Sequence, residues 1–364
     1  MNTIGGNLKL TVYGESHGVS VGAVLDGLPP GETVDWGEVR REMARRAPGK
    51  TSMSTSRAEG DNFAVQSGYC NGHTTGTPLA VMIANSDVRS EDYDDLRHLM
   101  RPGHADYTGK IRYGGYNDYR GGGHFSGRLT APIVFAGAVA KQILARRGIH
   151  VGAHILQIEK VTDRPFNPLG EEPAVFERLA RETLPVLDKS QAGCMAEVIT
   201  AAKEDSDSVG GCIEAMITGL PAGYGDPLFD SVESGLARML FAVPAVKGLS
   251  FGDGFALAAM RGSVSNDAMY YDADGTVRTK SNHNGGINGG ITNGMPVLFR
   301  TVIKAAASIG KEQDTVDTDN KKNAKLIIKG RHDPCIVQRA VPVIENAAAW
   351  TILDILLTQG GRYT

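Results

Sequence analysis

The two halves of the sequence share one succession of short motifs, and this internal repeat limits the folds open to the chain. A strand-like stretch ending in Gly-Leu-Pro-x-Gly spans 16–31 and recurs at 208–223. Each copy is followed by an aspartate placed to cap a helix, Asp35 or Asp230. Three further segments recur in the same order: 72–81 at 290–299, 101–106 at 329–334, and the helical stretch from Arg128 in that from Arg339. One such match can arise by chance among turn sequences, but four in one order indicate related halves.

The repeat predicts an α+β fold in which two similar halves share one core. We expect a single domain over 1–364, with a pseudo-two-fold axis relating halves of approximately 1–150 and 193–364. Gly/Pro turns, and not long helical crossovers, join the strands, so the sheets should be antiparallel. The proline-rich, charged stretch 163–189 is predicted to be an outer excursion with a helix at 174–184.

Composition excludes several classes of function. With 41% hydrophobic residues and a net charge of −3, the chain is typical of a soluble globular protein and unlike a general nucleic-acid binder. Its four cysteines are far apart and form no CxxC pair, which predicts no metal site, no disulfide framework and a reducing, cytoplasmic setting. The N-terminal residues lack a signal pattern, and the apolar run 131–140 is too short to cross a bilayer, so no membrane role is expected.

The stretch 101–128 carries the densest cluster of binding chemistry. It holds five Lys or Arg and two His against two Asp, together with many glycines and four tyrosines. Long polar loops inside compact proteins are usually functional or disordered. Cationic groups, backbone N–H groups freed by glycine and flat aromatic faces suit a planar, phosphorylated ligand. The alternative is a solvated, flexible surface loop.

Two histidines are candidates for proton chemistry, and the segment around Asp333 is a further candidate site. His17 lies in a glycine-bracketed turn and His104 lies within the polar stretch, and a histidine can donate and accept protons near neutral pH. Asp333 follows a predicted strand, beside Arg331 and His332. The alternatives are an exposed turn histidine at 17 and a structural salt bridge between Arg331 and Asp333.

Eight motifs in one order resemble the chorismate synthase family. They are GESHG (14–18), RRAPGK (45–50), STSR (54–57), HTTGTP (73–78), RPGHADYT (101–108), the YRGGG…SGR run (119–128), SNHNGGINGG (281–290) and GRHDPC (330–335). The resemblance implies a sandwich in which antiparallel sheets enclose helices, assembled as a homotetramer. It also implies a lyase that converts 5-enolpyruvylshikimate 3-phosphate to chorismate by an anti-1,4-elimination of phosphate and a proton. That reaction needs reduced FMN and belongs to the shikimate pathway of aromatic amino-acid biosynthesis.

The same resemblance implies roles for individual residues. It assigns His17 as the acid that protonates the leaving phosphate, His104 to the protonation of the flavin, and Asp333 to support of proton removal through the flavin N5. Residues implied to bind FMN are His124, Phe125, Ser126, Pro244, Ala245, Gly289, Lys304, Ala305, Ala306, Ala307, Ser308 and Arg331. Residues implied to bind the phosphate and carboxylate groups of the substrate, or NADP, are Arg46, Ser52, Arg57 and Arg128. NADPH is the implied reductant.

The chain departs from the family pattern at two places. Many relatives read Gly-Gly-Gly-Arg-Ser-Ser-Ala-Arg where this chain has Gly-Gly-Gly-His124-Phe125-Ser126-Gly127-Arg128, and Ser52 stands near a position often occupied by arginine. Both departures remove positive charge. Two other functions stay open from the residues: a single-strand-binding protein that stacks bases on 113–128, and a different flavin oxidoreductase. A Rossmann dinucleotide site is excluded because no GxGxxG follows a strand and opens a helix.

Overall fold

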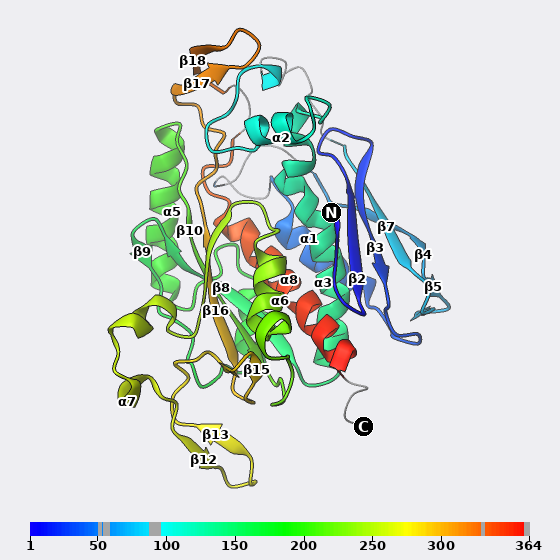
Figure 1. The fold of residues 1–364 in the computed structure, drawn as a ribbon, viewed down its shortest axis with the longest axis vertical. Helices are drawn as coiled ribbons and strands as arrows, with labels where there is room; N and C mark the ends of the chain where they lie inside the picture. The colour runs from blue at the N-terminus through cyan, green and yellow to red at the C-terminus, as the bar shows by residue number, and fades with distance from the viewer. Residues whose placement is uncertain (50–52, 54–58, 87–95, 329–331, 360–364) are drawn as a thin grey trace.

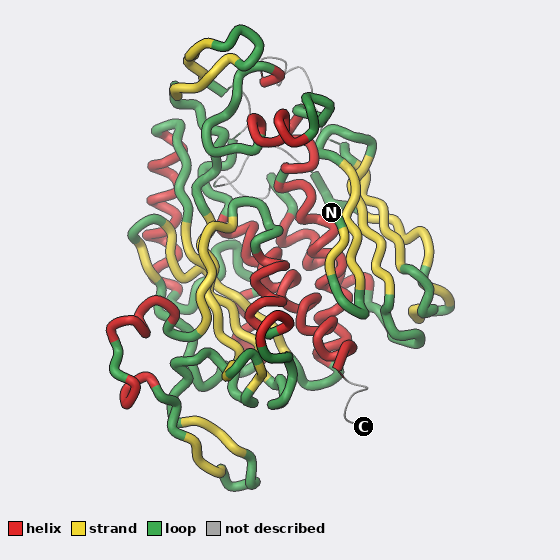
Figure 2. Tube along the Cα trace, in the orientation of Figure 1, coloured by secondary structure: helices red, strands yellow, loops and turns green. Residues whose placement is uncertain are grey.

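Two five-stranded antiparallel sheets enclose a layer of helices (Figures 1 and 2). The computed structural model describes residues 1–49, 53, 59–86, 96–328 and 332–359. The first sheet has the order β1 (Thr3–Ile4), β2 (Lys9–Gly14), β3 (Ser20–Asp26), β7 (Leu79–Ala84) and β4 (Phe63–Ser67). The second has the order β9 (Val161–Thr162), β8 (His150–Ile158), β10 (Gly211–Thr218), β16 (Val297–Ile303) and β11 (Val246–Phe251).

The two strand orders correspond position by position. The strands that end in Gly-Leu-Pro-x-Gly, β3 and β10, each lie at the centre of a sheet. The strands that follow the second repeated motif, β7 and β16, are their respective neighbours. This correspondence supports the proposal that the chain consists of two related halves.

Two long apolar helices fill the space between the sheets. In the centre, α3 (Thr130–Ala145) packs against α8 (Val337–Gln359); α3 contacts the first sheet and α8 the second. Their close crossing requires a glycine, since a Cβ at Gly137 would lie 2.1 Å from the carbonyl oxygen of Asn346. Both helical segments, 127–145 and 337–359, are long and apolar enough to cross a membrane. However, 89% and 83% of their apolar 18-residue stretches are buried inside this protein. They form its core.

Shorter elements complete the helical layer and the edges. Beside α3 and α8 lie α1 (Trp36–Arg46) and α6 (Val232–Leu240). The remaining helices are α2 (Asp106–Arg112), α4 (Pro173–Leu179), α5 (Lys189–Glu204), α7 (Gly262–Ser265) and four 3-10 segments, 120–125, 127–129, 228–230 and 254–259. The remaining strands are β5 (Tyr69–Cys70), β6 (His73–Thr74), β12 (Met269–Tyr271), β13 (Val277–Thr279), β14 (Ile287–Asn288), β15 (Ile291–Thr292), β17 (Gln313–Asp317) and β18 (Lys322–Leu326).

Local predictions from the repeat were partly right. Asp35 caps α1 as predicted, because its carboxylate accepts from the backbone N–H groups of Gly37 and Glu38. The matching prediction for Asp230 was wrong: Ser231 caps α6 by accepting from the N–H of Ser234, and Asp230 ends a 3-10 turn.

Two helices differ from the sequence-based expectation. The helix predicted at 174–184 ends at Leu179, and α5 was not predicted although Asp188 caps it. The stretch 163–189 packs against the second sheet, because Phe166, Phe176 and Leu179 form a small core with Met216 of β10 and Leu298 of β16. The polar stretch 101–128, predicted to be loop, contains α2.

Candidate functional site

A cavity of about 730 Å³ lies where the polar stretch 101–128 meets the end of β16 and the start of α8. Its size is within the range of about 300–1,000 Å³ found for small-molecule sites. Predicted site residues that line it are His17, Arg46, His104, His124, Phe125, Ser126, Arg128, Pro244, Ala245, Lys304, Ala305, Ala306, Ala307, Ser308 and Asp333. These residues come from both halves of the chain, so the cavity depends on the whole fold.

Among the predicted residues that the structure describes, Gly289 does not line the cavity. Gly289 lies in the turn between β14 and β15. Ser52, Arg57 and Arg331 lie outside the residues that the structure describes.

A buried ion pair orients His104. Arg101 donates from Nε and Nη2 to the two carboxylate oxygens of Asp106, each at 2.7 Å, and from Nη1 to Ser308 Oγ at 3.2 Å. His104 Nδ1 lies 2.7 Å from Asp106 Oδ1, so Nδ1 carries the proton and donates it to the carboxylate. Burial alone would raise the pKa of Asp106, but hydrogen bonds from Arg101 and His104 outweigh burial and hold that pKa well below its usual range.

The imidazole of His104 packs on a glycine. A Cβ at Gly122 would lie 3.0 Å from Cε1 and 3.1 Å from Nε2 of His104. Gly122 also has φ +84°, a conformation that glycine adopts without strain. Because Nδ1 is occupied by Asp106, Nε2 is the atom of His104 that remains available for proton transfer.

His17 is packed against the glycine-rich segment 120–125, which also contains Gly122. It is almost fully buried at the rim of the cavity, and a Cβ at Gly121 would lie 2.7 Å from its Cδ2 and Nε2 atoms. The N–H of Ser16 donates to the carbonyl of Gly123 at 3.1 Å. His124 donates from Nδ1 to the carbonyl of Gly14 at 2.8 Å. The glycine-rich segment therefore holds the His17 turn from one side.

Small residues after β16 form the opposite wall. Ala305, Ala306 and Ala307 line the cavity without long side chains, and Ser208 Oγ donates to the carbonyl of Ala306 at 2.7 Å. Lys304 Nζ donates to the carbonyl of Ala305 at 3.3 Å. Burial, and then the charge of Lys247, lower the pKa of Lys304. This wall combines a flat surface with a partly desolvated ammonium group.

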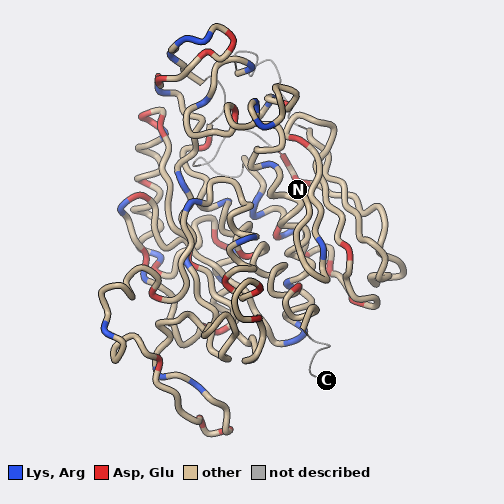
Figure 3. Tube along the Cα trace, viewed as in Figure 1, with Lys and Arg blue, Asp and Glu red and all other residues tan. Residues whose placement is uncertain are grey.

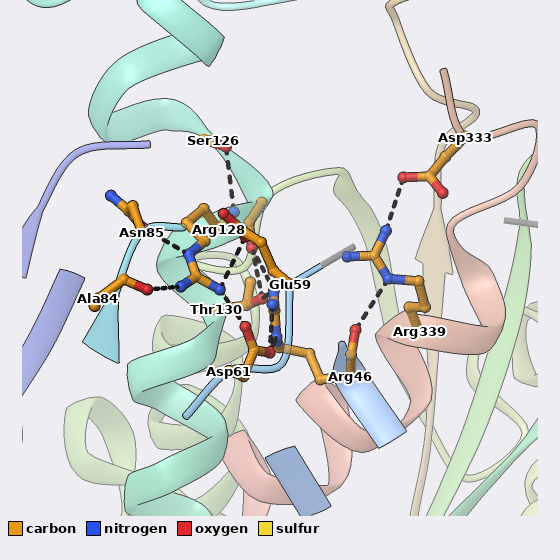
Figure 4. Close-up of polar contacts among 11 residues, drawn as sticks. Arg46, Glu59, Asp61, Ala84, Asn85, Ser126, Arg128, Thr130, Asp333 and Arg339 are labelled. Carbon is orange, nitrogen blue, oxygen red and sulfur yellow. Dashed lines mark hydrogen bonds and ion pairs between the residues drawn. The ribbon is translucent and has the colours of Figure 1, made fainter. Parts of the chain in front are cut away.

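Buried charges link Arg46 and Arg128, which both line the cavity; Figure 4 shows their contacts. Arg46 donates from Nε to Asp61 Oδ2 at 2.6 Å, and Arg128 pairs with Asp61 Oδ1 and, at 3.1 Å, with Glu59 Oε2. Each of these four residues is at most 5% exposed. The two positive and two negative charges cancel within the cluster.

The start of α8 joins this cluster to Asp333. Arg339 donates from Nε to the carbonyl of Arg46 at 2.9 Å and from Nη1 to Asp333 Oδ2 at 2.7 Å (Figure 4). His332 Nε2 donates to the carbonyl of Ile328 at 2.8 Å. Asp333 therefore lines the cavity as an ion-paired carboxylate.

Comparison with known proteins shows which family the chain belongs to. The sequence model of the chorismate synthase family matches residues 8–357. The chain belongs to the chorismate synthase family. It is 45% identical over 363 residues to the chorismate synthase of Porphyromonas gingivalis, covering 100% of this chain and 97% of that protein. It is 45% identical over 350 residues to that of Pyrococcus abyssi, covering 96% of each chain.

A solved structure supports the same family. A crystal structure of chorismate synthase matches with a TM-score of 0.77 and 26% identity, covering 98% of this chain and 94% of that one. Family membership makes this chain an enzyme, a lyase, and it supports that class over a nucleic-acid binder or a flavin oxidoreductase. Along the described chain, Lys and Arg are interspersed with Asp and Glu (Figure 3).

Sequence reasoning missed several residues that shape the site of this family member. Arg101 and Asp106 flank His104 in the RPGHAD motif, and their adjacency was a usable signal. Asp61 and Arg339 had no such signal. The nearest partner of Asp61 along the chain is Arg46, 15 positions away, and that of Arg339 is Asp333, 6 positions away. Only the folded chain brings those partners together.

Proposed function

We propose that this chain converts 5-enolpyruvylshikimate 3-phosphate to chorismate and phosphate by an anti-1,4-elimination that requires reduced FMN, as a step of the shikimate pathway. The observation that carries the proposal is the meeting of His17, His104 and Asp333 at one cavity in a chain that belongs to the chorismate synthase family. The electrons of the C6–H bond form a double bond between C6 and C1, the electrons of the existing ring double bond move from C1–C2 to C2–C3, and the C3–O bond breaks with its electrons leaving on phosphate.

The walls of the cavity fit FMN. The side chains of Ala305, Ala306 and Ala307, with the glycine-rich segment opposite, leave room for a flat ring against the backbone. Ser126 and Ser308 place hydroxyl groups at the same cavity. These residues, with His124, Phe125, Pro244 and Ala245, would hold FMN, and Gly289 and Arg331 remain predictions from the family. Reduced FMN, when bound, supplies electron density to the electron-poor ring of the reacting substrate.

Lysines supply a place for anionic groups. Lys304 forms no ion pair within the described residues, and burial, followed by the nearby charge of Lys247, lowers its pKa. An anion beside these two ammonium groups would relieve their repulsion, and a charge-assisted hydrogen bond is worth about 1.5–3 kcal/mol. FMN and the substrate both carry phosphate, so the arrangement suits either. Arg46, Arg57 and Arg128 remain proposed ligands of the substrate's anionic groups.

The histidines supply and hold protons. His17, at the rim, would donate a proton to the departing phosphate. His104 would hold or move a proton at Nε2, because Asp106 fixes the proton on Nδ1. Asp333 would support proton removal from C6, and its bond to Arg339 holds its carboxylate in place at the cavity.

An anaerobic assay tests the proposal. Dithionite-reduced FMN and the phosphorylated enolpyruvyl substrate should yield chorismate and phosphate in equal amounts. His17→Ala and His104→Ala should each lower kcat by roughly 100-fold or more, while FMN binding is retained. His73→Ala is a matched control at an exposed position of β6, where Nδ1 donates to the carbonyl of Asn71, and it should leave kcat unchanged. Full activity in both cavity variants would remove the proposed mechanism.

Two further parts of the proposal have their own measurements. Chorismate formation from NADPH and oxidised FMN, with no second protein added, would show that the chain reduces its own flavin. The homotetramer expected for a cytoplasmic enzyme of this family is tested by light scattering, which should give four times the mass of the chain. A monomer at working concentration would contradict that assembly.

A further inference from the structure

Asn85 holds the turn that carries His17. It follows β7, and its backbone N–H donates to the carbonyl of Val19 at 3.2 Å. Its side-chain nitrogen donates to the carbonyl of Glu15 at 2.9 Å and to that of Gly18 at 2.8 Å. These two carbonyls lie on either side of Ser16 and His17, so a single side-chain amide ties both ends of the turn.

The third hydrogen bond of the Asn85 side chain anchors it to the buried charge cluster. Its Oδ1 accepts from Arg128 Nε at 2.9 Å (Figure 4). The partners fix the orientation of the amide, because carbonyls can only accept and a guanidinium can only donate. Arg128 is itself held by Asp61, by Glu59 and by the carbonyl of Ala84 at 3.0 Å. Asn85 therefore connects the His17 turn to a buried, ion-paired guanidinium group.

We propose that Asn85 is a positioning residue that sets the place of the His17 imidazole for proton transfer; this inference rests on the proposed function. The glycine-rich segment holds the turn on one side, through the carbonyls of Gly14 and Gly123. Asn85 holds it on the other side. Loss of its two donors frees the carbonyls of Glu15 and Gly18 and lets the ring shift. A displacement of about 1 Å in a reacting group can lower the rate about 100-fold.

Asn85→Asp is the sharpest perturbation. Aspartate has nearly the same shape and keeps an oxygen for Arg128, but it replaces both donors with an acceptor that faces two carbonyls. We expect kcat to fall by roughly 30- to 100-fold, while the substrate KM and the FMN dissociation constant change by less than about threefold. Asn7→Asp is the matched control, because that amide donates at 3.3 Å to the carbonyl of Leu357 on the exposed surface. It should leave kcat unchanged.

A double-mutant cycle decides whether Asn85 acts through His17. Asn85→Asp, His17→Ala and the double variant are assayed as FMN-loaded enzyme. If Asn85 positions His17, adding Asn85→Asp to His17→Ala should change kcat by less than about twofold. Multiplied losses would overturn the proposal, and so would a normal kcat in Asn85→Asp. A normal kcat in His17→Ala would instead overturn the proposed function. Should Asn85→Asp fail to fold, Asn85→Ser takes its place in the same cycle.

Discussion

Asp61→Asn should destabilise the protein more than any exposed carboxylate change, because Asp61 neutralises two buried arginines. Its Oδ2 accepts from Arg46 Nε at 2.6 Å, and its Oδ1 pairs with Arg128. Asparagine is the right substitution for this position. Asp61 has φ +49°, a left-handed conformation that both Asp and Asn tolerate, so the backbone preference is retained and only the charge is lost.

The expected loss follows from the burial of the cluster. Removing one partner of a buried ion pair leaves an uncompensated charge and costs about 3–5 kcal/mol. A chain of 364 residues has an entropy of unfolding near Tm of about 0.8 kcal/mol/K. The two values together give a fall in Tm of roughly 4–6 °C. Arg128 can still pair with Glu59 at 3.1 Å, which places the result toward the smaller end.

Differential scanning calorimetry measures this shift, with Asp314→Asn as the matched control. Asp314 pairs with Lys325 at 2.6 Å, but its side chain is 87% exposed. Exposed pairs contribute about 0–1 kcal/mol, so the control should shift Tm by less than about 1 °C. If Asp61→Asn lowers Tm no more than Asp314→Asn, the cluster does not carry the buried, mutually compensated charges inferred from the structure.

Two other predictions concern stability. His154 donates from Nδ1 to Asp163 and from Nε2 to Glu214, each at 3.1 Å; burial alone lowers its pKa, but these hydrogen bonds outweigh burial and raise it. Because the pKa of His154 is raised in the folded protein, its contribution to stability is complete below the unfolded pKa of about 6.5 and is lost as pH rises through the folded pKa. The Tm difference between the parent and His154→Gln should therefore shrink from about pH 6 to about pH 9. A constant difference would contradict this. Ala245 has φ +72°, which costs an L-residue about 1–2 kcal/mol, so Ala245→Gly should raise Tm by about 1 °C while the control Ala242→Gly does not. A lower Tm for Ala245→Gly would show that no strain is relieved there.

The fold was predictable where the repeat carried the information. The motif-bearing strands β3 and β10 occupy equivalent central places, and Asp35 caps α1 as its sequence context indicated. Prediction failed where two neighbours compete for one role. Asp230 and Ser231 are both good capping residues, and the chain uses Ser231 because Asp230 is already within a 3-10 turn.

The site was predictable where its residues are adjacent in the sequence. The RPGHAD motif contains Arg101, His104 and Asp106, which form one hydrogen-bonded group. The roles of Asp61 and Asn85 depend on pairing with Arg128, which lies 67 and 43 residues away. No local pattern encodes such partners, because the fold creates the contact by placing the end of β7 beside the start of α3.

Charge neutralisation changes how the cavity can attract its ligands. From the family, Arg46 and Arg128 were predicted to face anionic groups, and both line the cavity. Both guanidinium groups are nevertheless paired with Asp61, so their net attraction for a distant anion is small. Lys304 and Lys247 have the opposite property, because burial of Lys304 and then its repulsion by Lys247 lower the pKa of Lys304, and a bound phosphate would favour the charged form of both. Within the described residues, the long-range attraction of a phosphorylated ligand should therefore come from the lysines, and the arginine cluster should serve to hold the His17 turn through Asn85.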